Sequence, residues 1–131
     1  QKGAQLVAQM CEQEGAITHR FQGDLANPSE ISRVFTEFDA AFPQLDALVN
    51  NAGIVDHPQR VDEMSYERLR RMVDVNLIAP ILVAKEAVLR MSKQYGGEGG
   101  VIVNTGSAAA RLGSANQYVD YAAMTCRIWC P

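Results

Sequence analysis

The stretch LDALVNNAG, residues 45–53, decides the fold of this chain of 131 residues. It begins as a short apolar run and ends in residues that tolerate a sharp turn, which is the pattern of a buried parallel strand followed by a permissive loop. Farther along the chain, VIVNTGS at residues 101–107 repeats the pattern. Toward the N-terminus, Ala16 to Phe21 indicates a shorter strand. We therefore expect three strands.

Amphipathic segments separate these strands. The apolar residues Leu6, Val7 and Met10, followed by Gly15, indicate the end of an amphipathic helix with a glycine stop. Asn27 to Pro43 begins with a proline in its first turn and repeats its apolar residues on one face, so it predicts a second helix. Ser65 to Gln94 predicts a long helix with a kink at Pro80. Helices that alternate with strands imply right-handed crossovers and a doubly wound parallel α/β sheet.

The composition favours a soluble domain that handles a small molecule. The chain is 47% hydrophobic and 21% charged, and its net charge of -3 comes from interspersed charges, so nothing favours nucleic acid or an anionic membrane as partner. No apolar run reaches the roughly 20 residues that span a bilayer. We expect a cytoplasmic protein with reduced thiols at Cys11, Cys126 and Cys130 and without a metal site.

Polar residues gather where ligands bind in such folds. Ligands of open parallel sheets lie beyond the carboxyl ends of the strands, where Asp24, residues 50–53 and Ser107 are expected. Each has a structural alternative. The run Asn50 to Gly53 could be an ordinary turn after a strand, and Asp24 could cap a helix or a turn.

Asn76 interrupts an apolar helix face. Positions 69, 73, 76, 80 and 83 advance in steps of three and four, so an amide lies on an apolar stripe. A buried amide needs partners, and a purely structural asparagine is one interpretation. Pro80 offers another, because it lacks the N–H that would bond the carbonyl of residue 76. That carbonyl would then be free to hold a water molecule.

The order of these residues resembles the short-chain dehydrogenase/reductase family. Asn50-Asn51-Ala52-Gly53, then Asn76, Ser107 and Tyr121 follow the family's sequence of motifs, and the resemblance extends to about Ala123. It implies a single, partial Rossmann-like dinucleotide-binding domain over residues 1–131, with flanking helices and the strand order 3-2-1-4-5-6. It also implies NAD or NADP as cofactor and a small alcohol or carbonyl compound as substrate.

The same resemblance suggests a role for each residue at the site. It places Asn50, Ala52 and Gly53 beneath the adenosine ribose and implies that Asp24 accepts a hydrogen bond from the adenine amino group. Three further residues would be catalytic: Ser107 would bind the substrate oxygen, Tyr121 would transfer its proton, and Asn76 would hold a relay water through its backbone.

One activating residue of the family is missing. A free tyrosine has a pKa of about 10, so a tyrosine base requires a neighbouring positive charge at neutral pH. The family supplies a lysine four residues after the tyrosine, but this chain has Thr125 there. Tyr118 competes with Tyr121 as a candidate, although Ala122 follows it at that spacing. The segment from Met124 to Pro131 departs from the family pattern.

Further family parts are absent from the sequence. The glycine-rich loop that would hold the cofactor pyrophosphate should precede Ala16 to Phe21, and these 131 residues lack it. We therefore expect a truncated chain that is inactive alone and binds NAD(P) weakly. The strand at Ala16 to Phe21 must pair with residues 45–49, pair with another chain, or leave its edges exposed, which favours a homo-oligomer. The alternative function is a non-catalytic adenosine-binding or oligomerisation module.

Overall fold

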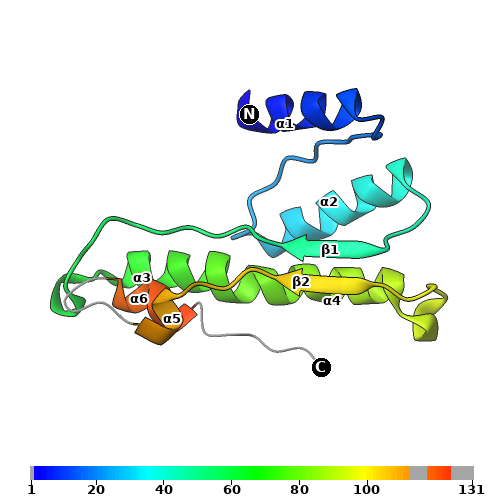
Figure 1. The fold of residues 1–131 in the computed structure, drawn as a ribbon. Helices are drawn as coiled ribbons and strands as arrows, with labels where there is room; N and C mark the ends of the chain where they lie inside the picture. The colour runs from blue at the N-terminus through cyan, green and yellow to red at the C-terminus, as the bar shows by residue number, and fades with distance from the viewer. Residues whose placement is uncertain (1, 113–117, 125–131) are drawn as a thin grey trace.

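The computed structural model describes residues 2–112 and 118–124. Its strands form one two-stranded parallel sheet, and its helices do not cover the two faces of that sheet equally (Figure 1). The elements in chain order are α1 (Lys2–Gln13), α2 (Pro28–Ala41), β1 (Ala47–Asn50), η1 (Val61–Glu63), α3 (Tyr66–Val73), the π-helical segment η2 (Asp74–Ile78), α4 (Ala79–Met91), η3 (Lys93–Tyr95), β2 (Val101–Asn104), α5 (Ala109–Leu112) and α6 (Val119–Met124).

The predicted helix boundaries are close to those observed, because the capping residues act as expected. The side chain of Asn27 accepts a hydrogen bond from the backbone N–H of Ser29 at 3.1 Å, which caps α2 ahead of Pro28. Gly15 follows α1 with a φ of 84°, a left-handed conformation that glycine adopts without strain. These local signals place α1 and α2 within a few residues of their predicted ends.

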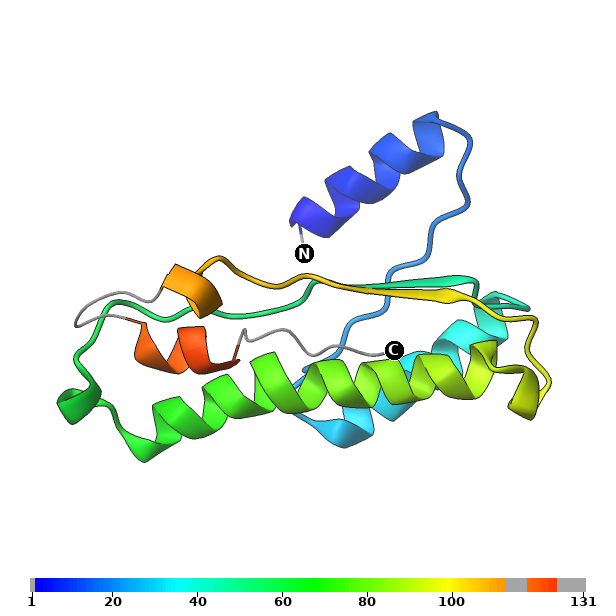
Figure 2. The same cartoon turned by 60° about the horizontal axis from the view of Figure 1, so that its bottom comes forward.

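Three segments run as one long helix beneath the sheet. Figure 2 shows α3, the π segment and α4 in continuous succession. The N–H of Ala79 bonds the carbonyl of Asp74, five residues earlier, so the chain takes a wider turn directly before Pro80. The helix then ends at Met91 and leads into a glycine-rich turn. A Cβ on Gly97 would lie 2.3 Å from the carbonyl oxygen of Arg90, so only glycine fits that close approach.

The sheet contains the two strands that the family order makes neighbours. β1 pairs with β2 in parallel, with Asn50 opposite Asn104. The expectation of a third strand at Ala16 to Phe21 is wrong for the described residues: this segment forms no strand, and Ile17 is 83% exposed. A strand is defined by its hydrogen-bonded neighbour, and no described strand lies beside this segment.

The expectation that the strands are buried is also wrong. Val49 and Val103, opposite each other in the sheet, are 65% and 49% exposed. Figure 2 shows α2 and α4 together on one side of the strands, whereas α1 lies on the other side with Leu6, Val7 and Met10 exposed. The core therefore lies between α2, α4 and one face of the sheet. Its members are Ile31, Phe35 and Ala79, with Leu25, Leu45, Leu82 and Val83 packed against them.

An ion pair fastens α4 to α2 beside this core. The guanidinium of Arg90 contacts the carboxylate of Asp39 at 2.6 Å and that of Glu86 at 2.8 Å, and it lies 4.7 Å from the centre of the Phe35 ring. The hydrogen bond from Arg90 lowers the pKa of Asp39 below its ordinary value. This contact fixes the helix pair that supports the candidate site.

Candidate active site

One side chain, that of Asn50, links the end of β1 to α4 and to β2. The amide nitrogen of Asn50 donates to the carbonyl of Pro80 at 2.9 Å and to the side-chain oxygen of Asn104 at 3.2 Å. The backbone N–H of Thr105 also donates to the Asn50 carbonyl at 3.0 Å. Asn50 thus fixes where the strands end relative to the long helix, and the loop after it starts from a defined point.

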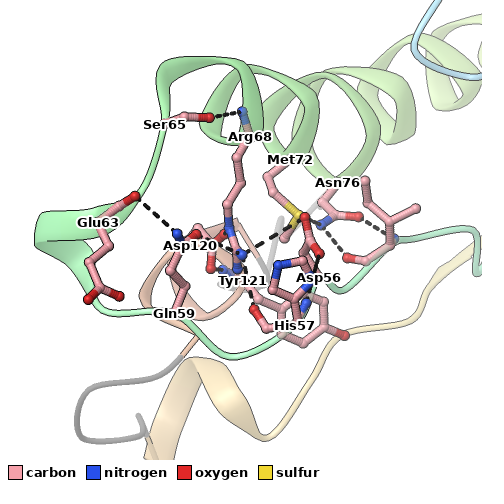
Figure 3. A network of polar contacts seen from close by, with 11 residues as sticks. Asp56, His57, Gln59, Glu63, Ser65, Arg68, Met72, Asn76, Asp120 and Tyr121 are labelled. Atoms are coloured by element: carbon pink, nitrogen blue, oxygen red, sulfur yellow. Dashed lines mark hydrogen bonds and ion pairs between the residues drawn. The ribbon is translucent and has the colours of Figure 1, made fainter.

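Asn76 holds that loop from below. The side-chain oxygen of Asn76 accepts from the N–H of Ile54 at 2.8 Å, and its amide nitrogen donates to the Ile54 carbonyl at 2.8 Å (Figure 3). Asn76 is buried in the π segment, so this two-way contact satisfies both ends of its amide. The structural interpretation of the side chain is therefore correct, while the role of its backbone carbonyl stays a prediction.

Two of the predicted cofactor-binding residues form an open ledge after β1. Ala52 and Gly53 are exposed. A Cβ on Gly53 would lie 3.2 Å from the side-chain oxygen of Asn76, so a larger residue would press on the clamp that holds the loop. The surface of this ledge is open because the side chains of its residues are small.

Asp24 lies before α2 in the structural role that the sequence left open. Its carboxylate accepts a hydrogen bond from the N–H of Ala26 at 3.0 Å, and its carbonyl accepts from the N–H of Asn27 at 2.9 Å. Asp24 therefore stabilises the turn that leads into α2. The side chain is exposed, so its carboxylate retains further acceptor positions.

Ser107 and Tyr121 lie on the segments that follow β2. The hydroxyl oxygen of Ser107 accepts from the N–H of Ala109 at 3.2 Å, at the start of α5. Tyr121 is partly buried on α6, and α6 packs against α5, α3 and the π segment that carries Asn76. Helices far apart in sequence thus bring the predicted catalytic tyrosine to the same end of the sheet as Asn76. Thr125, which takes the place of the family's lysine, is outside the described residues, as are Cys126 and Cys130.

This region also contains a buried ion pair that no sequence pattern indicated. The Nε of Arg68 lies 2.8 Å from a carboxylate oxygen of Asp120, and the two side chains are only 7% and 1% exposed. Burial raises the pKa of Asp120, but the hydrogen bonds from Arg68 and from the N–H of Tyr121 outweigh it, so the pKa lies below its ordinary value. The pair is ionised at neutral pH and joins α3 to α6.

Arg68 reaches the loop after β1 as well. Its Nη1 donates to the carbonyl of His57 at 3.0 Å and to the side-chain oxygen of Gln59 at 3.1 Å (Figure 3). The carboxylate of Asp56 lies 3.9 Å from the same nitrogen. One guanidinium therefore connects three segments around the candidate site. The sequence contains only a weak indication of this role for Arg68. Positions 68, 72 and 76 share a helix face, but no sequence rule pairs an arginine with an aspartate 52 residues away.

The described residues offer no sign of a metal or membrane site. Within residues 2–112 and 118–124, no group of His, Cys, Asp and Glu side chains is placed to hold a metal ion. In the same part of the chain, no helix combines the length and the apolar character needed to cross a membrane.

Known proteins share this arrangement of elements. A short chain dehydrogenase from Burkholderia cenocepacia, solved in complex with NADP, matches with a TM-score of 0.82 and 32% identity over 93% of this chain and 47% of that chain. An NADH-dependent reductase, A1-R', solved with NAD, matches with a TM-score of 0.72 and 27% identity over 80% of this chain and 44% of its own.

Sequence relatives and a family model agree with these structures. The uncharacterized oxidoreductase YgfF of Escherichia coli is 41% identical over 92% of this chain and 49% of its own length. A 3beta-hydroxysteroid dehydrogenase of Mediterraneibacter gnavus is 31% identical over 100% of this chain and 52% of its own. The chain thus spans about half the length of these curated relatives. Because the family model for short chain dehydrogenases matches residues 1–124, the chain belongs to the short chain dehydrogenase family.

Proposed function

We propose that this chain is part of an oxidoreductase that uses NAD or NADP and acts on a hydroxyl or carbonyl group of a small molecule. The observation that carries the proposal is the convergence of the loop after β1, the π segment and α6 at the carboxyl end of the strands. Ligands of parallel sheets bind at that end. Family membership supports the class of reaction.

The ledge after β1 suits the adenosine part of the cofactor. We assign Asn50, Ala52 and Gly53 to the surface beneath the ribose. The Asn50 amide is engaged by Pro80 and Asn104, so Asn50 would face the ribose with its backbone. Ala52 and Gly53 are exposed and small enough to let a sugar approach. The Asp24 carboxylate would accept a hydrogen bond from the adenine amino group, at an acceptor position that the turn before α2 does not use.

The proposed catalytic groups divide the work of proton transfer. When bound, the nicotinamide supplies or accepts the hydride. The Ser107 oxygen already accepts a bond from Ala109, and its hydroxyl hydrogen can donate to the substrate oxygen. Tyr121 would give that oxygen a proton or take one from it, and the backbone carbonyl of Asn76 would hold the water that exchanges this proton with solvent.

We propose that the 131-residue chain is inactive by itself. Thr125 cannot provide the positive charge that would favour ionised Tyr121 at neutral pH. General acid–base catalysis contributes about 10²–10⁴-fold, so a tyrosine without its activating charge would lose much of the rate. A second candidate function, a non-catalytic adenosine-binding or oligomerisation module, is favoured by the same threonine.

A chimera tests the proposed function. Residues 1–124 would replace the matching half of the Burkholderia cenocepacia protein, whose other half then completes the fold. We expect the chimera to bind NADP in calorimetry and to reduce members of a carbonyl panel. Tyr121→Phe should abolish turnover and keep binding, whereas Ala52→Trp should abolish binding. Ala4→Trp, on exposed α1, is the matched control. A folded chimera that does not bind NADP would refute the cofactor assignment.

The isolated chain separates the two candidate functions. We expect no turnover with either nicotinamide cofactor, and NAD(P)H binding too weak to detect by calorimetry. Turnover that disappears in Tyr121→Phe would contradict the proposal that this chain is inactive. Low-micromolar NAD(P)H affinity that is lost in Asp24→Ala would favour the adenosine-binding module.

A further inference from the structure

We propose that the buried ion pair between Arg68 and Asp120 is a positioning device for Tyr121, which sets how the tyrosine is presented to the site. The inference rests on the proposed role of Tyr121 in proton transfer. Arg68 and Asp120 are positioning residues, because neither needs to touch the substrate or the cofactor.

The contacts form a continuous link from the long helix to the tyrosine. One carboxylate oxygen of Asp120 receives the Nε of Arg68 at 2.8 Å. The other accepts the backbone N–H of Tyr121 at 2.9 Å. Because both oxygens of one planar group are engaged, a shift of Arg68 would move the backbone of Tyr121 with it. Charge-assisted bonds of this kind are short and directional.

The link also fixes Tyr121 relative to the loop after β1. Arg68 uses its Nη1 to hold the His57 carbonyl and the Gln59 side chain, and Gln59 in turn donates to the carbonyl of Glu63 at 3.0 Å. That loop begins at the ledge proposed for the cofactor. The guanidinium therefore lies between the loop and α6 and contacts both (Figure 3).

Helix α6 depends on its neighbours α3, α5 and the π segment for its orientation. It spans only Val119–Met124, and helices this short are marginal without outside contacts. None of its residues belongs to the main core cluster, and Val119 is 44% exposed. A buried ion pair is a poor source of net stability compared with apolar packing, and its best-attested benefit is a unique geometry.

The pair carries a further cost that a purely stabilising contact would avoid. Among the described residues, the Nη2 of Arg68 is buried without a hydrogen-bond partner. Unsatisfied buried donors are unfavourable. A nearby pair on the same helix avoids this cost: Arg70 contacts Asp74 at the same 2.8 Å, but its side chain is 63% exposed. Arg70→Met is therefore the matched control for Arg68→Met.

The test uses the 131-residue chain with tyrosine labelled with ¹³C at the ring carbon that bears the hydroxyl. The chain has four tyrosines, and Tyr121→Phe assigns the relevant signal. Tyr95, in η3 at the far end of the long helix, is the internal reference. The variants are Arg68→Met, Asp120→Asn, the two combined, and Arg70→Met. The combined variant removes both buried charges, so it tests geometry without leaving an unpaired charge.

We expect the Tyr121 signal to leave its wild-type position in both single variants and in the combined variant, while the Tyr95 signal stays in place. Arg70→Met should move neither signal. Two results would overturn the proposal: a Tyr121 signal that returns to its wild-type position in the combined variant, or Tyr95 and Tyr121 signals that move together in every Arg68 and Asp120 variant. The measurement needs no turnover, so it can fail or succeed independently of the chimera.

Discussion

Asn76 has an observed role for its side chain and a proposed one for its backbone carbonyl. Its side-chain oxygen accepts from the N–H of Ile54, and its amide nitrogen donates to the Ile54 carbonyl and to the sulfur of Met72, so the side chain serves as a clamp on the loop that carries the proposed cofactor ledge. A proton-relay role could therefore involve only the backbone carbonyl. The sequence pointed to the residue because an amide interrupts an apolar stripe, but it could not identify Ile54, since a backbone partner leaves no trace in the residue pattern.

The clamp predicts a specific loss of stability. Asn76→Ala leaves the partly buried N–H and carbonyl of Ile54 without their partners, so we expect the free energy of unfolding to fall by about 1–3 kcal/mol. Urea denaturation followed by circular dichroism at a fixed protein concentration measures it. Asn51→Ala, exposed on the same loop, should change the value by about 0.5 kcal/mol or less. Equal losses in the two variants would argue against the clamp.

The lowered pKa of Asp120 predicts how α6 responds to low pH. Its pKa in the folded chain lies below the ordinary value of 3.8, because the hydrogen bonds to Arg68 and Tyr121 outweigh the effect of burial. A carboxylate with a lowered pKa stabilises the fold fully above its unfolded pKa, and that contribution is lost as the pH falls through the folded pKa. We therefore expect α6 to loosen only below about pH 3.8.

A local probe is needed for this acid transition, because Asp39 also has a lowered pKa through Arg90 and protonates in the same region. Hydrogen exchange at the N–H of Ala122, which bonds the Tyr118 carbonyl at 2.9 Å, reports on α6 alone. Asp120→Asn should abolish the loss of protection of this N–H at low pH, once the intrinsic pH dependence of amide exchange is subtracted. An unchanged acid transition in Asp120→Asn would show that another group controls α6.

At the scale of elements, the long helix shows where periodicity succeeds and where it fails. Its extent was predictable from apolar spacing and from the glycine-rich run that follows it. The face it buries was predicted only in part: Leu69 is 38% exposed, whereas Met72 and Val75 are buried. A π turn inserts extra backbone into the helix, so a stripe drawn at a uniform helical period changes face across Asp74–Ile78.

The pairing of α3 with α6 was beyond sequence analysis for a different reason. Arg68 and Asp120 are ordinary charged residues on helices that are 52 positions apart. Charged side chains at a helical spacing most often face solvent, and a single sequence contains nothing that selects one partner among the many charges of opposite sign. Their contact depends on the docking of α6, which is a tertiary event.

This pairing predicts unequal effects for two arginines on one helix. Arg68→Met leaves the Asp120 carboxylate buried and uncompensated, so we expect the free energy of unfolding to fall by about 3–5 kcal/mol. Arg70→Met removes an exposed pair and should cost about 1 kcal/mol or less. Denaturant titration of both variants measures the difference. The combined Arg68→Met and Asp120→Asn variant should recover part of the loss, and a combined variant as unstable as Arg68→Met would count against this account.

At the scale of the whole molecule, the alternation of strands and helices was enough to predict a parallel α/β sheet, and the family order correctly made β1 and β2 neighbours. Burial of the strands was not predictable. An apolar run indicates that a strand has apolar faces, but it does not indicate whether another element packs on each face. Here one face of the sheet stays open, and the segment at Ala16 to Phe21 remains unpaired among the described residues.

That open face leads to the expectation that the chain associates with itself. A two-stranded sheet is marginally stable in water unless something covers it, and the described strands present unpaired backbone edges that a second chain can use. Apolar side chains on the sheet and on the outer side of α4 add to the exposed area. They are Val49, Val101, Val103, Ile81 and Val88.

Light scattering at micromolar concentration tests whether the chain associates with itself. We expect a mass above the 14.3 kDa of one chain, with an unfolding midpoint that rises with protein concentration. Val49→Thr together with Val103→Thr makes the open face polar and keeps residues that suit a strand, so this variant should shift the mass toward the monomer. Val61→Thr, on an equally exposed valine in η1 away from the sheet, should leave the mass unchanged. A single species at 14.3 kDa, with cooperative unfolding that does not depend on concentration, would mean that α2, α4 and one covered face are enough to sustain this sheet alone.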